Sequence, residues 1–206
     1  MRRAGLLSVT VALVCACATE TDTPYDPLDD YEELDSARSI DAPDPEPGRY
    51  SPMDRDKIDR GEYLVELLAC GSCHTDGAFE GIPDMSRPLA GSGTGIAWTS
   101  PLESEFPAVV YPPNITPHEK TGIGRWSDGQ IANAIRAGVG RHGDRRIVTM
   151  PWQGYAKMTD DDIDAIVVYL RSIKPIRNKV PKPVNMGEKA HSPFVYYGVY
   201  RSKRDR

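Results

Sequence analysis

The run Cys70-Gly71-Ser72-Cys73-His74 constrains this chain of 206 residues more than any other feature. Two thiols separated by two residues and followed at once by an imidazole form the attachment signature of a c-type haem. In such sites the cysteines carry thioether bonds and the histidine binds the iron. We therefore predict one covalently bound haem c, attached through Cys70 and Cys73 and ligated by His74.

Other uses of the two cysteines are less consistent with the sequence. The chain has four cysteines, and the remaining two, Cys15 and Cys17, lie in the N-terminal leader. A structural zinc site needs two further ligands at comparable spacing, and no second C-x-x-C or H-x-x-x-H occurs. A thioredoxin-like dithiol requires a βαβ context, whereas the flanks of this motif have helical character. Haem attachment remains the favoured interpretation.

The N-terminus resembles an export signal. A basic start followed by an apolar run at 6–14 predicts a signal sequence over residues 1–17, and the run is too short to span a bilayer. Cys17 follows the small residue Ala16 as in a bacterial lipobox, so we expect Cys17 to be lipidated. The alternative is simple secretion after cleavage at a small residue. In either case we expect an exported protein that faces the periplasm, with a lipid as its membrane anchor in the first case.

Residues 18–49 have a different composition. Eleven acidic residues and several prolines lie between Glu20 and Glu46, with few large aliphatic side chains. Such a segment buries too little apolar surface to offset its ordering entropy, so we predict a disordered acidic tether over 18–49. From Gly48 onward, 22 basic and 19 acidic residues nearly balance. This near-neutral part offers no basic face for nucleic acid.

Three segments are predicted to be helical, and no run of alternating residues indicates a strand. The first covers 54–69 and contains Gly61, which a close helix crossing would explain. The second begins at Ser127, where a capping box starts, and stops at Gly138. The third begins at Thr159 and ends before Pro175. The sequence thus predicts an all-α fold in which three main helices and long loops surround one haem.

The axial position opposite His74 has several candidate ligands. Met150 is favoured because it stands between the second and third helices, where a loop can cross the far face of the haem, and Pro151 stiffens that crossing. A lone methionine is by default core filler, so His142 and an open distal site remain alternatives. The other candidates are Met53, Met85, Met158, Met186, His118 and His191.

Several short motifs make the chain similar to class I c-type cytochromes. They are Asn114-Ile115-Thr116-Pro117, the stretch from Thr121 to Ser127, Met150-Pro151-Trp152 with Tyr155, Met158-Thr159-Asp160 and Tyr169-Leu170-Arg171-Ser172. More narrowly, the chain resembles one haem unit of the cytochrome subunits of bacterial membrane-bound alcohol and sugar-acid dehydrogenases. The resemblance implies a cytochrome c-like fold with Met150 as the distal ligand. It also implies that a proline carbonyl of the stretch Pro88 to Gly91 accepts a hydrogen bond from His74.

The resemblance further implies a function in electron transfer. We expect a carrier, not itself an enzyme, that passes single electrons between a dehydrogenase or respiratory complex and a downstream acceptor. A haem enzyme or gas sensor with an open distal site is the alternative. The expected division is a leader over 1–17, the tether over 18–49, a cytochrome c domain over 50–183 and a C-terminal extension with a basic tail over 184–206.

Overall fold

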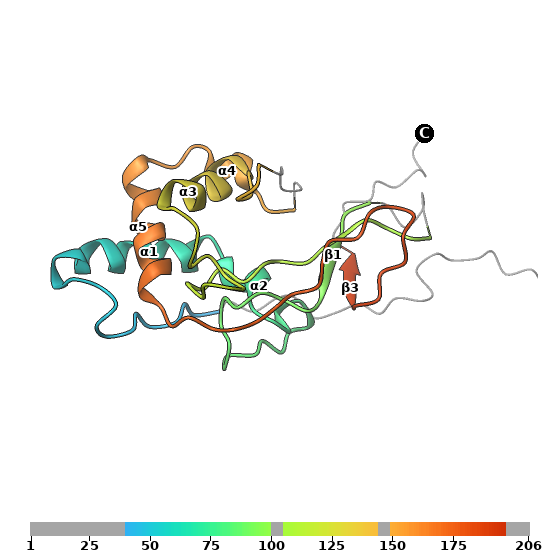
Figure 1. Ribbon diagram of the computed structural model, residues 1–206, viewed down its shortest axis with the longest axis horizontal. Helices are drawn as coiled ribbons and strands as arrows, with labels where there is room; N and C mark the ends of the chain where they lie inside the picture. The colour runs from blue at the N-terminus through green and yellow to red at the C-terminus, as the bar shows by residue number, and fades with distance from the viewer. Residues whose placement is uncertain (1–39, 100–104, 144–148, 197–206) are drawn as a thin grey trace, which may run out of the picture. The chain divides into compact units, whose positions relative to one another are not determined.

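The computed structural model describes residues 40–99, 105–143 and 149–196, and everything below concerns these residues (Figure 1). The helices are α1 (Arg55–Leu67), α2 (Cys70–His74), α3 (Asp128–Ala137), α4 (Trp152–Tyr155) and α5 (Asp160–Ser172), with 3-10 turns at Pro52–Asp54 and Ala78–Glu80. The strands are β1 (Gly95–Ala97), β2 (Val109–Val110) and β3 (Phe194–Tyr196). The fold is mainly helical, and α1, α3 and α5 are the three main helices that the sequence predicts.

Helices α1 and α5 cross in direct contact (Figure 1). Gly61 is buried at the crossing, and a Cβ there would collide with the Ala165 carbonyl and lie 2.6 Å from the Cβ of Tyr169. A glycine inside a helix costs about 1 kcal/mol relative to alanine, and the close approach explains why it is present. The expected reason for Gly61 is confirmed.

The predicted helix ends are also confirmed. The Gln130 N–H donates to Ser127 Oγ at 3.2 Å, and the Ser127 N–H donates to Gln130 Oε1 at 2.9 Å, which completes the capping box. Gly138 ends α3 with a φ of +63°. At the start of α5, the Asp162 N–H donates to Thr159 Oγ1 at 3.1 Å. Side-chain oxygens therefore satisfy backbone donors that the helices themselves leave unpaired.

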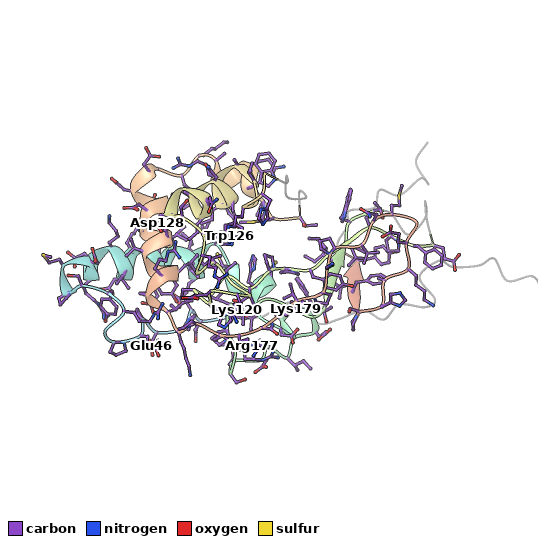
Figure 2. The ribbon with its side chains drawn as sticks, in the orientation of Figure 1. Glu46, Lys120, Trp126, Asp128, Arg177 and Lys179 are labelled. Carbon is purple, nitrogen blue, oxygen red and sulfur yellow. The ribbon has the colours of Figure 1, made fainter. Side chains whose placement is uncertain are left out.

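Arg171 joins the C-terminal part of α5 to the loop before α3. Its Nη2 and Nε donate to Asp128 Oδ1 at 2.9 and 3.1 Å. Its Nη1 donates to the Ile123 carbonyl at 3.1 Å, and its Nη2 also reaches the Trp126 carbonyl. Figure 2 labels Trp126 and Asp128 at this junction. One guanidinium thus holds several groups of the loop that leads into α3.

A small sheet in order β2-β1-β3 was not expected from the sequence. Ile96 of β1 lies opposite Val110 in the antiparallel pair and beside Val195 in the parallel pair. Ala97, Val109 and Tyr111 form a second apolar cluster there. Strands of two or three residues are too short for alternation to be recognised, so the all-α prediction holds for the main architecture and misses this sheet.

The tether predicted over 18–49 includes residues that pack against the folded domain. Ile40 is 9% exposed and lies against Gly71, the Tyr169 hydroxyl donates to the Pro43 carbonyl at 2.6 Å, and the Glu46 N–H donates to the Ser172 carbonyl at 2.8 Å. The assignment of 40–49 to a disordered segment is therefore wrong, because these residues find their partners on α2 and α5. Residues 1–39, which include the predicted leader, Cys17 and the rest of the tether, lie outside the described residues.

Within residues 40–99, 105–143 and 149–196, no helix combines the length and apolar character that crossing a membrane requires.

Candidate haem site

Helix α2 carries all three residues of the attachment motif. Ala69 precedes it with φ 52° and ψ 40°, a left-handed conformation that turns the chain sharply between α1 and α2. Residues three and four apart on a helix share one face, so Cys70 lies beside both Cys73 and His74. The short helix thus presents two sulfur atoms and an imidazole together.

The two thiols are partly buried and protonated at neutral pH. Burial raises the pKa of Cys70 to about 12, and burial also raises the pKa of Cys73. A redox-active dithiol needs a cysteine whose pKa is lowered towards neutrality. The environment of α2 therefore opposes the thioredoxin-like alternative and is compatible with cysteines that become thioethers.

The ring of His74 is held by a backbone carbonyl. Its Nδ1 lies 2.7 Å from the Pro113 oxygen. A carbonyl can only accept, so Nδ1 carries the proton and Nε2 keeps the lone pair in the neutral imidazole. This tautomer is the one that binds a metal through Nε2, and the hydrogen bond at Nδ1 raises the basicity of the ligand.

The proline expected to contact His74 is the wrong one. The carbonyl at Nδ1 belongs to Pro113 and not to the stretch Pro88 to Gly91. That stretch instead holds the backbone beside the ring: the Gly91 N–H donates to the His74 carbonyl at 2.7 Å, and the Leu89 N–H donates to Thr75 Oγ1 at 3.1 Å. Two separate loops therefore support the histidine.

The segment that carries Met150 approaches the attachment helix. Met150 is partly buried and lies two residues before Trp152, the first residue of α4, and its carbonyl accepts from the Trp152 N–H at 2.7 Å. Further along α4, the Tyr155 hydroxyl donates to the Leu68 carbonyl at 3.4 Å. Burial, with smaller contributions from Cys70 and Cys73, raises the pKa of Tyr155 to about 12. The hydrogen bond ties α4 to the turn between α1 and α2, while ligation by Met150 itself stays a prediction.

The other candidate ligands have different surroundings. Met158 packs against the main core, and Nδ1 of His118 accepts from the Thr121 N–H at 3.2 Å. The remaining candidates are exposed side chains: Met53, Met85, Met186, His142 and His191. An axial ligand must be shielded with the haem, so these environments favour Met150 over the exposed groups.

Buried polar atoms near α4 fit a bound group with acceptor oxygens. Among the described residues, the indole N–H of Trp152 and Nε of Arg136 are buried without a hydrogen-bond partner. Buried donors are nearly always paired, so such a pair of exceptions requires an explanation. The carboxylates of a haem would accept from donors of this kind. Together with the cysteines and the tautomer of His74, these atoms fit a covalently attached haem.

Two cysteines and a histidine on one short helix, within a three-helix fold, define a haem-attachment protein. The sequence profile of cytochrome c matches residues 58–174, and the chain belongs to the cytochrome c family. Members of this family carry covalently bound haem c, which Cys70 and Cys73 are placed to attach.

The chain is similar to cytochrome subunits of several dehydrogenases. It is 33% identical over 129 residues to the fructose dehydrogenase cytochrome subunit of Gluconobacter japonicus, covering 62% of this chain and 24% of that one. It is 33% identical over 135 residues to the gluconate 2-dehydrogenase cytochrome c subunit of Pantoea cypripedii, with 63% and 27% covered. The cytochrome c subunit of the quinone alcohol dehydrogenase of Gluconobacter oxydans is 31% identical over 160 residues, with 72% and 30% covered.

Each of these matches covers less than a third of the relative's length. The shared part is therefore only a portion of each of these subunits.

Proposed function

We propose that this protein is an electron carrier with a single haem c, attached at Cys70 and Cys73 and ligated axially by His74 and Met150. One C-x-x-C-H motif in the chain supports the single haem. The observation that carries the proposal is the Nδ1 hydrogen bond of His74 to the Pro113 carbonyl, on the same helix that supplies both cysteines. The haem supplies a one-electron change between Fe(III) and Fe(II).

The protein's own residues tune that electron change. The Pro113 carbonyl polarises the Nδ1–H bond, which makes the opposite nitrogen a stronger donor and stabilises the oxidised metal. Met150, as the second residue that would hold the iron, would favour the reduced metal and raise the potential. With His74 and Met150 both bound, the iron would have no place for a substrate, and we therefore propose a carrier and not an enzyme.

We further propose that the electron donor or acceptor is a redox protein, such as a dehydrogenase or a respiratory complex. The relatives are named as cytochrome subunits of fructose, gluconate and alcohol dehydrogenases, which supports a dehydrogenase partner. We also propose export to the periplasm with a lipid at Cys17 as the membrane anchor. Mass spectrometry of the wild-type and Cys17→Ser proteins tests the anchor, with Cys15→Ser as the matched control.

Absorption spectroscopy of the full chain, produced together with the haem-attachment machinery, tests the central proposal. We expect a coloured protein that keeps its haem in acid acetone. The oxidised form should show the weak far-red band that methionine sulfur gives ferric haem. Met150→Ala should keep the haem attached but lose this band and lower the midpoint potential. Met158→Ala should leave both the band and the potential unchanged. Cys73→Ser should impair attachment.

Two results would overturn the assignment of Met150. One is an unchanged potential in the Met150→Ala protein. The other is ready binding of carbon monoxide by the wild-type protein without the far-red band, which would instead support a haem enzyme or gas sensor with an open distal site. A colourless wild-type protein would show that no haem is attached and would overturn the whole proposal.

A further inference from the structure

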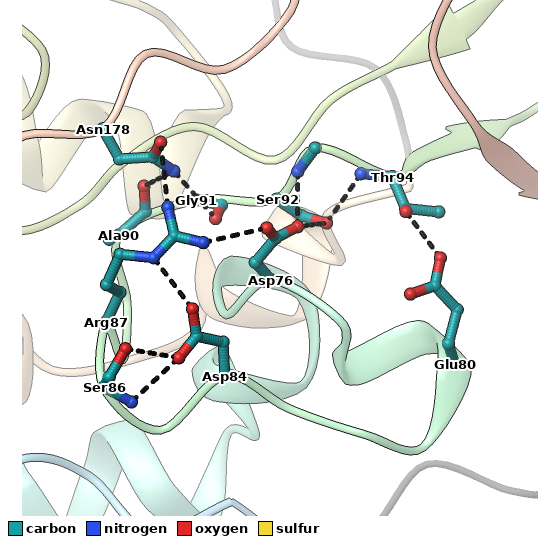
Figure 3. A network of polar contacts seen from close by, with 11 residues as sticks. Asp76, Glu80, Asp84, Ser86, Arg87, Ala90, Gly91, Ser92, Thr94 and Asn178 are labelled. Carbon is teal, nitrogen blue, oxygen red and sulfur yellow. Dashed lines mark hydrogen bonds and ion pairs between the residues drawn. The ribbon is translucent and has the colours of Figure 1, made fainter.

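A short segment after α5 lies outside the part of the chain matched to the family, which ends at residue 174. This segment, 176–180, is called the strap below. Its polar groups contact both loops that support His74: the loop with Ala90 and Gly91, and the loop from Pro113 to Thr116. Figure 3 shows Asn178 of the strap among the side chains of the first loop. The support of His74 therefore extends beyond the residues matched to the family.

The strap holds the first loop through a side-chain amide and an apolar contact. Asn178 Nδ2 donates to the Ala90 carbonyl at 3.0 Å and to the Gly91 carbonyl at 3.4 Å. Gly91 has a φ of +86°, and a Cβ on it would lie 2.6 Å from Cγ1 of Val180. The same glycine donates its N–H to the His74 carbonyl. One turn is thus fixed between the strap and His74.

The strap holds the second loop mainly through its backbone. The Ile176 carbonyl accepts from Asn114 Nδ2 at 2.7 Å, and the Ile176 N–H donates to Thr116 Oγ1 at 3.0 Å. Asn114 is 3% exposed and Thr116 is fully buried, so few water molecules compete for these groups. Asn114 directly follows Pro113, the residue whose carbonyl meets the ring of His74. The position of that carbonyl therefore depends on the strap.

Arg87 sets the orientation of the Asn178 amide. Its Nη1 donates to Asn178 Oδ1 at 3.4 Å, while Nη2 reaches Asp76 at 3.3 Å and Nε reaches Asp84 at 2.8 Å (Figure 3). A guanidinium can only donate, so it must face the amide oxygen and leave the NH₂ group towards the two carbonyls. The network fixes which way the amide points.

We propose that Asn178 is a positioning residue for His74, which rests on the proposed ligation of haem by that histidine. The amide fastens the turn that holds the backbone of His74, and the adjoining backbone of the strap fastens the loop that holds its ring. The two loops are also joined directly, since the Ile115 N–H donates to the Leu89 carbonyl at 3.0 Å and the Ser92 N–H donates to the Pro112 carbonyl at 3.1 Å. Loss of the amide loosens the turn at Ala90 and Gly91, and through these bonds it weakens the hydrogen bond from Nδ1 to the Pro113 carbonyl. The imidazole then becomes a weaker donor to the metal, and the oxidised state is less stabilised.

The test compares Asn178→Ala with Asn185→Ala in the haem-loaded full-length protein. Asn185 lies further along the same extended chain, is exposed and bonds only to Glu188 among the described residues, so it is the matched control. We expect Asn178→Ala to keep its covalent haem, shift its midpoint potential upward and exchange the Nδ1 proton of His74 roughly two- to tenfold faster in NMR. Asn178→Ser, which keeps one donor, should shift both quantities less.

A potential and a proton-exchange rate that match those of Asn185→Ala would overturn the proposal. It is also overturned if Asn178→Ala loses thermal stability while both readouts stay at their wild-type values, because the residue would then be merely structural. If Asn178→Ala does not fold, the same two readouts in Asn178→Ser decide. Failure of the proposed function has a different signature, since the wild-type protein itself would then lack the haem or its ligation by His74.

Discussion

The crossing of α1 and α5 and the loops around His74 are held together in different ways. At the crossing, apolar side chains and a glycine allow two helices to touch, and Ile58, Val65 and Tyr169 are almost completely buried. Around His74 the chain has little regular structure, and buried polar side chains such as Asn114 and Thr116 satisfy the backbone instead. The first region depends on shape and the second on matched donors and acceptors.

The comparison shows how a chain with long loops can hold a rigid histidine. Loops lack the repeating hydrogen bonds of helices and sheets, so each buried N–H and carbonyl needs its own partner. Asn114 alone serves two segments, because its Oδ1 accepts from the Thr116 N–H at 2.9 Å while its Nδ2 donates to the Ile176 carbonyl. Substitutions in the two regions should therefore destabilise the protein for different reasons. At the helix crossing the reason is a steric clash, and in the loops around His74 it is a buried polar group that loses its partner.

The largest effect is expected from Gly61→Ala at the helix crossing. The added methyl group would collide with the carbonyl of Ala165, so α1 and α5 must separate, and we expect a loss of about 3 kcal/mol in the free energy of unfolding. Gly129→Ala is the control, because Gly129 lies on α3 and an added Cβ there would have no neighbour within 4 Å. Denaturant unfolding measures both. Equal stability of the two variants would show that the crossing is not tightly packed.

Asn114→Ala should lower the free energy of unfolding somewhat less than Gly61→Ala does, and its effect should be strongest in the loops around His74. It removes the amide that pairs with both the Ile176 carbonyl and the Thr116 hydroxyl and leaves the mutual contact of these two groups at 3.3 Å, a loss worth about 2 kcal/mol. Amide hydrogen exchange should quicken in the loops around His74 before it does so in α1 and α5. Asn133→Ala on the exposed side of α3 is the control. If exchange rises equally throughout the described residues, the two regions do not differ as we infer.

A smaller effect is expected at the N-terminus of α5. Thr159→Ala removes the oxygen that accepts from the Asp162 N–H, and we expect a loss of about 1 kcal/mol in unfolding free energy. Thr159→Ser keeps an oxygen and should restore most of the loss. This local contribution should leave the loops around His74 unchanged in hydrogen exchange. A Thr159→Ser protein as unstable as Thr159→Ala would indicate that the lost methyl group matters instead of the cap.

The smallest expected effect is on the stability of the fold at acidic pH. Hydrogen bonds from Arg60 and Thr159 lower the pKa of Asp162, and hydrogen bonds from Ser86 and Arg87 lower that of Asp84. A lowered folded-state pKa contributes stability above the unfolded value, and this is lost as pH falls from roughly 4 through the folded value. Asp162→Asn and Asp84→Asn should each slightly flatten the fall in melting temperature in that range. If the melting temperature of both variants falls with pH as steeply as that of the wild-type protein, these carboxylates do not contribute to the loss of stability in acid.

The sequence reveals those parts of the fold that leave a local pattern. The caps at Ser127 and Thr159, the stop at Gly138 and the close crossing at Gly61 were all predictable, because each depends on residue types at fixed spacings. The attachment motif was equally clear for the same reason. The sheet was missed because its strands have two or three residues, and the packing of 40–49 was missed because its acidic, proline-rich composition resembles that of disordered segments.

The residues that support His74 leave no recognisable local pattern in the sequence. Pro113 contributes a backbone carbonyl, which every residue possesses, so only the fold can select it. Asn178 is an asparagine in a loop, where the residue type normally indicates a turn. The sequence does contain one hint, since Asn114 and Thr116 belong to one of the motifs on which the predicted family resemblance rests. Ligation by Met150 stays a prediction that spectroscopy has to test.

The order of these contacts along the chain has a consequence for biosynthesis. Pro113 follows His74 by 39 positions, and Asn178 follows Ala90 by 88. A chain made from its N-terminus therefore presents the two cysteines long before the strap exists. The strap can therefore close over the attachment helix only late in synthesis, and in a newly made chain the two loops lack the contacts that later hold them around His74.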